Sequence, residues 1–254
     1  MDQDCGCDEK SKIFNPHTSR HPKEVLPTTH QLCASLFHSR PVWEWDSPEI
    51  CLHVPPCPKV TVKVAQTLIG VVYDADGQVV YLKRFSNCRP KQGHVMHTEQ
   101  VLLKDKSFLS ALKDGCLVEI YSKYQPCHHS SGNCNFKDPR SCTSLLHEFM
   151  RSVLQPRNIH MHYYVCNLFR ATWNMDDEYY GKTIRSARKG IYILTRATPN
   201  FELRGMDAHH WQLLGVMCAE ALPFGWYHAR EAYDAQIRLL LADLQYPIGR
   251  RTGV

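Results

Sequence analysis

The chain has 254 residues, which is enough to bury a full hydrophobic core in one large domain. Its hydrophobic fraction of 43% and charged fraction of 22% are ordinary for a globular protein, and its formal charge of +5 permits binding to nucleic acid without demanding it. No apolar run approaches the ~20 residues of a membrane span, and the polar N-terminus lacks the apolar core of a secretory signal. We therefore expect a protein of the cytoplasm, the nucleus or both, without a membrane partner.

The twelve cysteines do not have the pattern of a short secreted disulfide framework. We expect most of them to be reduced thiols and a few to be metal ligands.

Residues 1–58 differ from the rest because they are rich in Pro, His, Ser and Cys, and only Gln31–His38 has the pattern of a short helix. We expect a partly ordered N-terminal extension there, followed by one domain at 59–254. In that domain, Thr67–Tyr73 and Val79–Phe85 are β-branched and aromatic runs. They are joined by a turn that contains Asp-Gly, which predicts a β-hairpin.

After the hairpin, helix and strand patterns alternate. The apolar spacing predicts a helix at His97–Leu112, a strand at Cys116–Tyr124, a helix at Ser141–Leu154, a strand at Ile159–Phe169, a helix at Asp177–Lys189, a strand at Ile191–Thr195, and two helices at about 206–219 and 229–245. A hairpin followed by such alternation predicts an α/β fold, with about six helices packed on a mixed five-stranded sheet.

Two short motifs indicate the chemistry. His97-Thr98-Glu99 supplies an imidazole and a nearby carboxylate, and Pro126-Cys127 follows after 26 residues with a thiolate. Imidazole and thiolates hold Zn²⁺ tetrahedrally, and a position left for water makes such a site catalytic. The metal lowers the pKa of that water, and Glu99 is placed to act as general acid/base without being a ligand. The pattern predicts hydrolytic deamination of a nucleobase.

Residues from about 60 to 245 resemble the AID/APOBEC group of polynucleotide cytidine deaminases. The resemblance rests on the hairpin, the helix that opens on the His97 motif, and the strand that runs into Tyr124-Gln125-Pro126-Cys127. The segment Asn167–Trp173 (NLFRATW) is similar to the start of the loop with which the family recognises its target base. The resemblance implies the cytidine deaminase fold, a zinc cofactor, and substrate contacts from five residues. These are Tyr124, His128, Phe169, Arg170 and Trp173.

The spacing of the second zinc cysteine is expanded relative to this family. Cys134 follows Cys127 after six residues and Cys142 after fourteen. Spacing favours Cys134, by analogy with a divergent branch of the family. Helix register favours Cys142, which lies at the start of a predicted helix and has Phe149 seven positions further on. We prefer Cys142 and keep Cys134 as the alternative.

Three functions follow from these observations. The first is an enzyme that deaminates cytosine to uracil in single-stranded DNA or RNA. The second is a catalytically silent module that binds nucleic acid or a protein partner, in which Cys134 and Cys142 both join His97 and Cys127 and close the zinc site. The third is a deaminase of free cytidine. We rank it last, because such enzymes are usually compact and this chain has two extra C-terminal helices. The sequence does not indicate an oligomeric state.

A basic stripe bears on the choice of substrate. Lys182, Arg185, Arg188 and Lys189 fall near one face of the helix predicted at Asp177–Lys189. Such a stripe is either an ordinary solvated surface or a track for phosphates, and the family resemblance favours the track.

Overall fold

Five strands form one sheet in the computed structural model, which describes residues 67–86, 97–129, 141–168, 171, 181–217 and 224–245. The strand order is β2-β1-β3-β4-β5. The strands are β1 (Thr67–Tyr73), β2 (Val79–Ser86), β3 (Leu117–Tyr124), β4 (His160–Asn167) and β5 (Phe201–Gly205). β1 is antiparallel to both of its neighbours, whereas β3, β4 and β5 run parallel, so the sheet is mixed.

Six α-helices accompany the sheet in the described part of the chain. They are α3 (Thr98–Leu102), α4 (Lys106–Ala111), α5 (Cys142–Phe149), α6 (Gly181–Leu194), α7 (Ala208–Met217) and α8 (Phe224–Gln245). A π-helical turn at Met150–Leu154 and a 3₁₀ turn at Gln155–Arg157 continue α5. The predicted α/β architecture is confirmed in its general form. The predicted N-terminal extension at 1–58 lies outside the described residues.

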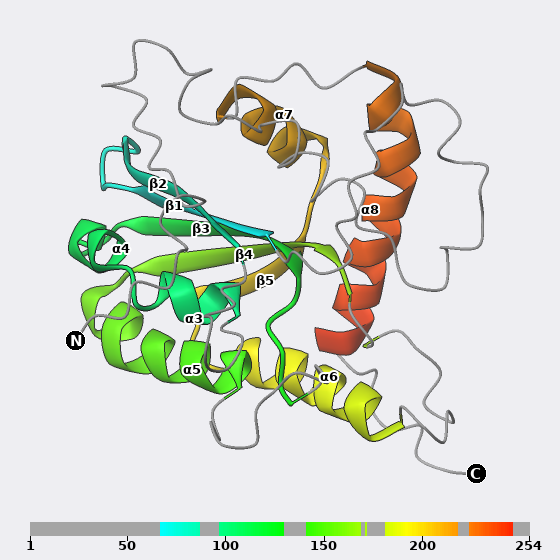
Figure 1. The fold of residues 1–254 in the computed structure, drawn as a ribbon, viewed down its shortest axis with the longest axis horizontal. Helices are drawn as coiled ribbons and strands as arrows, with labels where there is room; N and C mark the ends of the chain where they lie inside the picture. Colours follow the sequence, from blue (N-terminus) through cyan, green and yellow to red (C-terminus); the bar gives the residue numbers. More distant parts are fainter. Residues whose placement is uncertain are drawn as a thin grey trace, which may run out of the picture.

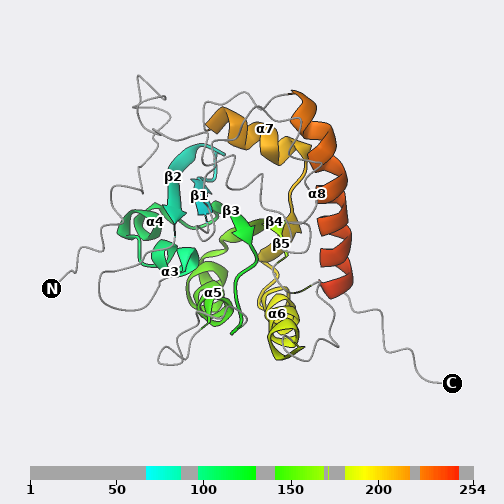
Figure 2. The same ribbon diagram turned by 45° about the vertical axis from the view of Figure 1, so that its right-hand side comes forward.

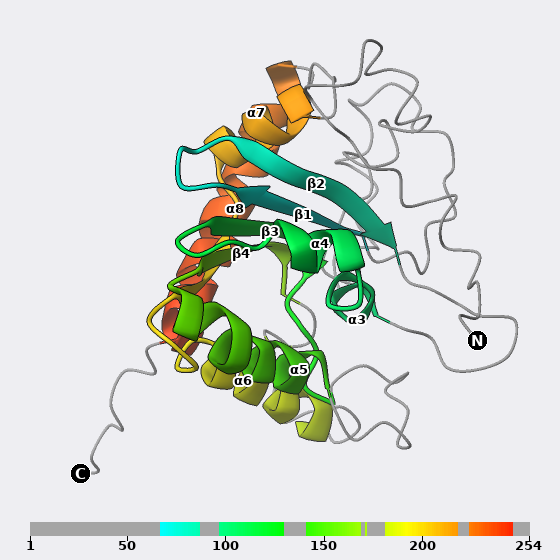
Figure 3. The ribbon, with the colours of Figure 1, turned by 90° about the vertical axis from the view of Figure 1, so that its left-hand side faces the viewer.

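The direction of the parallel strands explains where the helices lie. β3, β4 and β5 follow one another across the sheet, and right-handed crossovers in one direction place both connecting helices on the same face. Figures 1 and 3 accordingly show α5 and α6 side by side below the sheet, with α7 above it. Figure 2 shows α8 along the side of the sheet near β5. The loops that leave the carboxyl ends of β3 and β4 thus meet the start of α5 and α6.

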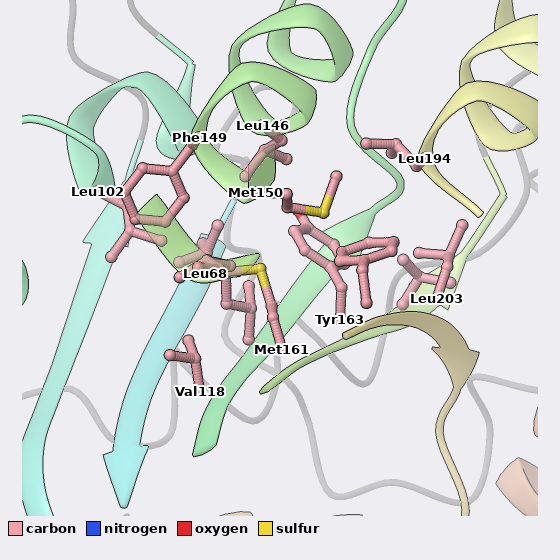
Figure 4. Close-up of a cluster of buried hydrophobic side chains, with 14 of the residues drawn as sticks. Leu68, Leu102, Val118, Leu146, Phe149, Met150, Met161, Tyr163, Leu194 and Leu203 are labelled. Atoms are coloured by element: carbon pink, nitrogen blue, oxygen red, sulfur yellow. The ribbon is translucent and has the colours of Figure 1, made fainter. Parts of the chain in front are cut away.

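Because successive side chains of a strand point to opposite faces of the sheet, the buried apolar residues form two clusters, one on each face. The face that carries α3, α5 and α6 has the larger apolar cluster, in which Leu68, Val118, Met161 and Tyr163 from the strands meet Met150. Figure 4 shows these side chains pointing into one volume between sheet and helices. A smaller cluster lies under α7, and its members include Ile69, Val71, Tyr121, Tyr164 and Trp211.

The helix predicted at His97–Leu112 is divided in two. Asp105 interrupts it, because its side chain accepts a hydrogen bond from the backbone N–H of Phe108 at 2.7 Å and so caps a new helix, α4. The Asp105 carboxylate also pairs with Lys83 Nζ at 2.6 Å and accepts from the Tyr81 hydroxyl at 3.3 Å. These contacts to β2 fix the break between α3 and α4.

The strand predicted at Ile191–Thr195 is wrong, because α6 continues to Leu194. Ile184, Ala187, Ile191 and Leu194 are all buried and repeat at helical spacing. A short apolar run does not distinguish a strand from a buried segment of helix. The fifth strand is β5, whose residues alternate between buried and exposed.

Within the described residues, no helix has the length and apolar character needed to cross a membrane. The four described cysteines, Cys116, Cys127, Cys142 and Cys166, form no disulfide.

Candidate metal centre

Three side chains from three segments converge at the carboxyl end of β3. The ligand atoms of His97, Cys127 and Cys142 all lie within 4.8 Å of one another. The Nδ1 atom of His97 is 3.3 Å from the Cys127 sulfur and 3.3 Å from the Cys142 sulfur. This is the only group of three or more His, Cys, Asp or Glu ligands among the residues that the structure describes.

The start of α3 presents His97. The sequence predicted His97 within the first turn, but its backbone is extended (φ −76°, ψ 157°) and the residue is the N-cap of a helix that begins at Thr98. The backbone N–H of His97 donates to the Gln100 side-chain oxygen at 2.9 Å. Glutamine three positions after the cap is the residue that a capping box uses, so this contact orients the residue that bears the ligand.

The start of α5 presents Cys142. Ser141 is the N-cap of this helix, and its hydroxyl accepts from the backbone N–H of Ser144 at 3.2 Å. The next residue ties α5 to the segment of the other thiol, because the Thr143 N–H donates to the Cys127 carbonyl at 2.9 Å. Since the N-terminal end of a helix stabilises negative charge, this position suits a thiolate. Cys134, the alternative ligand, lies outside the described residues.

The distances fit a shared ion better than hydrogen bonds. One imidazole Nδ1 has either one N–H or one lone pair in the ring plane, which cannot serve two sulfurs well. In a tetrahedral site with ordinary zinc bond lengths, a nitrogen and a sulfur ligand lie about 3.5 Å apart. Both separations here are 3.3 Å. His97, Cys127 and Cys142 could therefore hold a metal ion.

Glu99 is buried beside these ligands, with only 1% of its surface exposed. The Tyr163 hydroxyl donates to its Oε1 at 3.1 Å, and the Thr98 hydroxyl donates to its Oε2 at 3.2 Å. Tyr163 lies in β4 and is itself completely buried. Burial, together with the Glu99 carboxylate, raises the pKa of Tyr163 well above its usual value, so Tyr163 stays protonated and remains a donor.

The residues predicted to contact substrate are placed in part. Tyr124 ends β3 opposite Asn167 of β4, and burial raises its pKa to about 12. His128 follows Cys127 directly, and its ring Nδ1 lies 3.2 Å from the Ser141 hydroxyl. Burial, with His129 and Lys189 nearby, lowers the pKa of His128. His128 therefore borders the ligand cluster, and Tyr124 lies three residues before Cys127 at the end of β3. The other three predicted contacts, Phe169, Arg170 and Trp173, lie outside the described residues.

Helix α6 contacts the loop that carries Cys127 and His128. The Ser186 hydroxyl donates to the His128 carbonyl. One turn further along, Gly190 approaches so closely that an added Cβ would lie 2.7 Å from the His128 Cβ and 3.0 Å from the Thr143 hydroxyl. Only a residue without a side chain allows this approach. Gly190 therefore lets α6 approach the loop that carries Cys127 and His128.

Tyr163 and Gln100 are the neighbours that sequence reasoning missed. Gln100 left a usable signal, because a glutamine three residues after a helix cap is a known pattern. Tyr163 left a weaker one. It shares a strand face with Met161 and Val165, both fully buried, and a buried tyrosine needs a partner for its hydroxyl. That signal says a partner exists but does not identify Glu99.

No protein-family model matches the chain, and no curated protein matches it. Its function therefore has to follow from the residues of the site.

Proposed function

We propose that the protein is a zinc-dependent hydrolase that converts cytosine to uracil in single-stranded DNA or RNA. The observation that supports this most directly is the convergence of His97, Cys127 and Cys142 with a buried glutamate two residues from the histidine. Imidazole, two thiolates and a non-ligand glutamate are the set of groups that hydrolytic deamination of a nucleobase requires.

Zinc is the metal that this donor set favours. Thiolate and imidazole ligands in a tetrahedral arrangement suit Zn²⁺, whereas Mg²⁺ and Ca²⁺ prefer oxygen ligands. With three protein ligands, the ion keeps one position for a water molecule. A zinc ion held there supplies the Lewis acidity that makes water nucleophilic near neutral pH.

Glu99 moves the protons in the proposed reaction. Its carboxylate takes a proton from the attacking water and delivers it to N3 of the pyrimidine. It then takes the second proton to the 4-amino group, which leaves C4 as ammonia, while C4 keeps the oxygen of the water. Cytosine and water are thereby converted to uracil and ammonia. The hydrogen bond from Tyr163 holds one carboxylate oxygen in place during these transfers.

The experiment is to incubate zinc-quantified protein with a cytosine-containing single-stranded DNA and with the matching RNA, and then to sequence the products. We expect conversion of cytosine to uracil in one of the two polymers. The Glu99→Ala variant should keep its zinc and lose turnover. Full zinc occupancy without conversion would instead favour the silent binding module with a closed site.

Two cysteine variants test the ligand set with a matched control. Cys142 and Cys166 are both fully or almost fully buried, but Cys166 belongs to the apolar cluster under α7. We expect Cys142→Ser to lose most of its zinc and Cys166→Ser to retain one ion per chain, as measured by metal analysis. Equal zinc in both variants would exclude Cys142 as a ligand. Zinc loss in Cys134→Ser as well as in Cys142→Ser would support a closed site of four ligands.

A further inference from the structure

Helix α6 concentrates positive charge on one exposed side. Its 14 residues include two lysines and two arginines and no acidic residue, so its formal charge is +4. The whole chain has a formal charge of +5. The remaining 240 residues therefore sum to only +1. The basic bias of the protein is largely a property of this helix.

The structure redefines the stripe that the sequence suggested. Arg188 turns away from it, because its Nε donates to the Ala171 carbonyl at 2.7 Å. The exposed side chains instead repeat every three or four residues and include an aromatic ring. We call this set the α6 surface: Lys182, Arg185, Lys189, Tyr192 and Arg196. Alternating steps of three and four keep these positions on one side of a helix.

The positive charges of the α6 surface destabilise the helix when it is considered by itself. Arg185 lies three residues after Lys182 and four before Lys189, and like charges at these spacings destabilise a helix by roughly 0.2–0.5 kcal/mol per pair. The first turn has no acidic residue to balance the helix dipole. None of the described residues forms an ion pair with Lys182, Arg185 or Lys189. These charges face the solvent without a partner within the described part of the fold.

The middle of the α6 surface lies next to the candidate metal centre. Gly190, which follows Lys189 directly, approaches the residue after Cys127 so closely that an added Cβ would lie 2.7 Å from the His128 Cβ. Figures 1 and 2 show α6 beside α5 on the side of the sheet opposite α7. Lys182 and Tyr192 lie ten residues apart within α6, about 15 Å at helical rise, and Arg196 follows in the turn after the helix. A strand whose target base sat at the metal centre would therefore find basic side chains along α6.

We propose that the α6 surface binds the phosphate backbone of a single-stranded polynucleotide and so holds the strand whose cytosine reaches the metal centre. The inference rests on the proposed function for its choice of ligand. Phosphates match the unpaired cations, and single strands use basic grooves that include exposed aromatic rings. Tyr192 is 46% exposed, and the Arg196 guanidinium covers its ring at 3.8 Å. The contacts to phosphate are independent of base sequence, so DNA and RNA share this chemistry.

The test is binding of fluorescent 30-nucleotide DNA and RNA single strands by the zinc-loaded Glu99→Ala protein at several salt concentrations. The test variant reverses Lys182, Arg185 and Lys189 to Glu. The control reverses three exposed lysines and arginines outside α6, namely Lys106, Lys113 and Arg151. Both triple variants change the net charge equally. Only the α6 variant should lose at least 10-fold in affinity, and its slope of log K against log salt should fall by about 2, since each phosphate contact contributes about 0.7.

The outcomes separate this inference from the proposed function. Equal loss in both variants would overturn it, because general charge would then explain binding. Wild-type binding to vesicles containing phosphatidylserine, but to neither oligonucleotide, would also overturn it. Suppose that only the α6 variant shows a smaller slope of log K against log salt, and that wild-type protein converts no cytosine. The α6 surface would then be supported as a binding surface, and the proposed function would be wrong. If wild-type protein converts cytosine, and the α6 variant binds normally in the Glu99→Ala background and deaminates normally with Glu99 intact, the α6 surface fails and the proposed function stands.

Discussion

Among the described residues, one buried glutamate lies on each side of the sheet, and the two differ in their surroundings. Glu119 lies under α7, where it accepts from the Tyr121 hydroxyl at 2.6 Å and from the Tyr164 hydroxyl at 3.5 Å, and His162 Nδ1 is 3.9 Å away. Glu99 also accepts from a tyrosine, but it lies two residues from His97, one of three clustered residues that could hold a metal ion. Burial alone therefore does not identify a catalytic carboxylate. Glu119 belongs to a hydrogen-bonded network within the core, whereas Glu99 is the glutamate that we propose as the general acid/base.

The largest effect should come from exchanging each glutamate for glutamine. Glu99→Gln keeps the shape but removes the base, so we expect turnover to fall on the order of 10³-fold, with zinc content retained. Glu119→Gln should leave turnover near that of the wild type and lower the free energy of unfolding by about 1–3 kcal/mol, because a buried charged acceptor is lost. Deamination rates and urea unfolding at pH 7 measure the two effects. A large loss of turnover in both variants would contradict the contrast between them.

A second test concerns how the metal-bearing loop is held. Gly190→Ala would place a Cβ 2.7 Å from the His128 Cβ, an atom attached directly to the backbone that cannot swing aside. Alanine would gain about 1 kcal/mol of helix propensity, but overpacking costs about 1–3 kcal/mol, so we expect a net loss of stability. Thermal unfolding measures it.

Gly205→Ala is the comparison for this variant. Its nearest obstacle, at 2.8 Å, is Cγ of Arg238, a side-chain methylene that can rotate away whereas a Cβ cannot, and the Arg238 backbone N follows at 3.3 Å, so its loss should be smaller than that of Gly190→Ala. A Gly190→Ala protein at least as stable as wild type would show that α6 does not need this close approach.

These contrasts also show which parts of the molecule a sequence can predict. The hairpin, β3, β4 and the extents of α5 and α7 follow from local periodicity and turn residues, and they were predicted within a few residues. The division at Asp105 and the helical state of Ile191 depend on contacts to β2 and to the loop at His128, which periodicity does not report.

The candidate site likewise has some residues that the sequence predicts and one contact that it does not. His97, Glu99 and Cys127 lie in short motifs, so residue types and spacing suggested them directly. Cys142 was preferred because it begins an amphipathic helix, and the structure places it with the other two ligands. The hydrogen bond from the Tyr163 hydroxyl to the Glu99 carboxylate joins residues 64 positions apart in the sequence. Only the tertiary fold, which packs α3 on the sheet face that Tyr163 shares, brings them together.

The Glu119 network should give stability a pH dependence of known sign. Burial alone would raise the pKa of Glu119, but contacts from His162 and Tyr121 outweigh it and leave the pKa below its usual value. Because its pKa is lower in the folded state, ionised Glu119 stabilises the fold at pH values above its pKa in the unfolded chain, about 4.3. This stabilisation is lost as the pH falls through the pKa of Glu119 in the folded protein. The stability difference between wild type and Glu119→Gln should therefore shrink as the pH falls below about 4.

Urea unfolding of the two proteins at each pH measures this difference. Both carry the same metal ligands, so release of metal in acid cancels in the comparison. A difference that grows as the pH falls would mean that Glu119 is protonated in the folded protein and that the donors around it do not stabilise its charge.

The smallest and most selective effect should come from the adjacent tyrosines of β4. Tyr163 faces Glu99 and Tyr164 faces Glu119, so Tyr163→Phe and Tyr164→Phe each remove one hydroxyl from one glutamate. Each variant should lose roughly 1 kcal/mol of stability. Tyr163→Phe alone should lower kcat, by about 10-fold, which corresponds to about 1.4 kcal/mol, and KM should stay unchanged because the tyrosine does not reach the substrate.

The split between kcat and KM decides whether Tyr163 positions the general acid/base or only fills the core. A purely structural role would reduce the amount of folded enzyme and lower the apparent kcat of both variants in proportion to their stability. Normalising rates to zinc content removes that contribution, since only folded protein holds the ion at His97, Cys127 and Cys142. A remaining 10-fold loss in Tyr163→Phe, absent from Tyr164→Phe, would assign the orientation of Glu99 to one hydrogen bond across the sheet face. Equal normalised rates would show that Glu99 keeps its position without it.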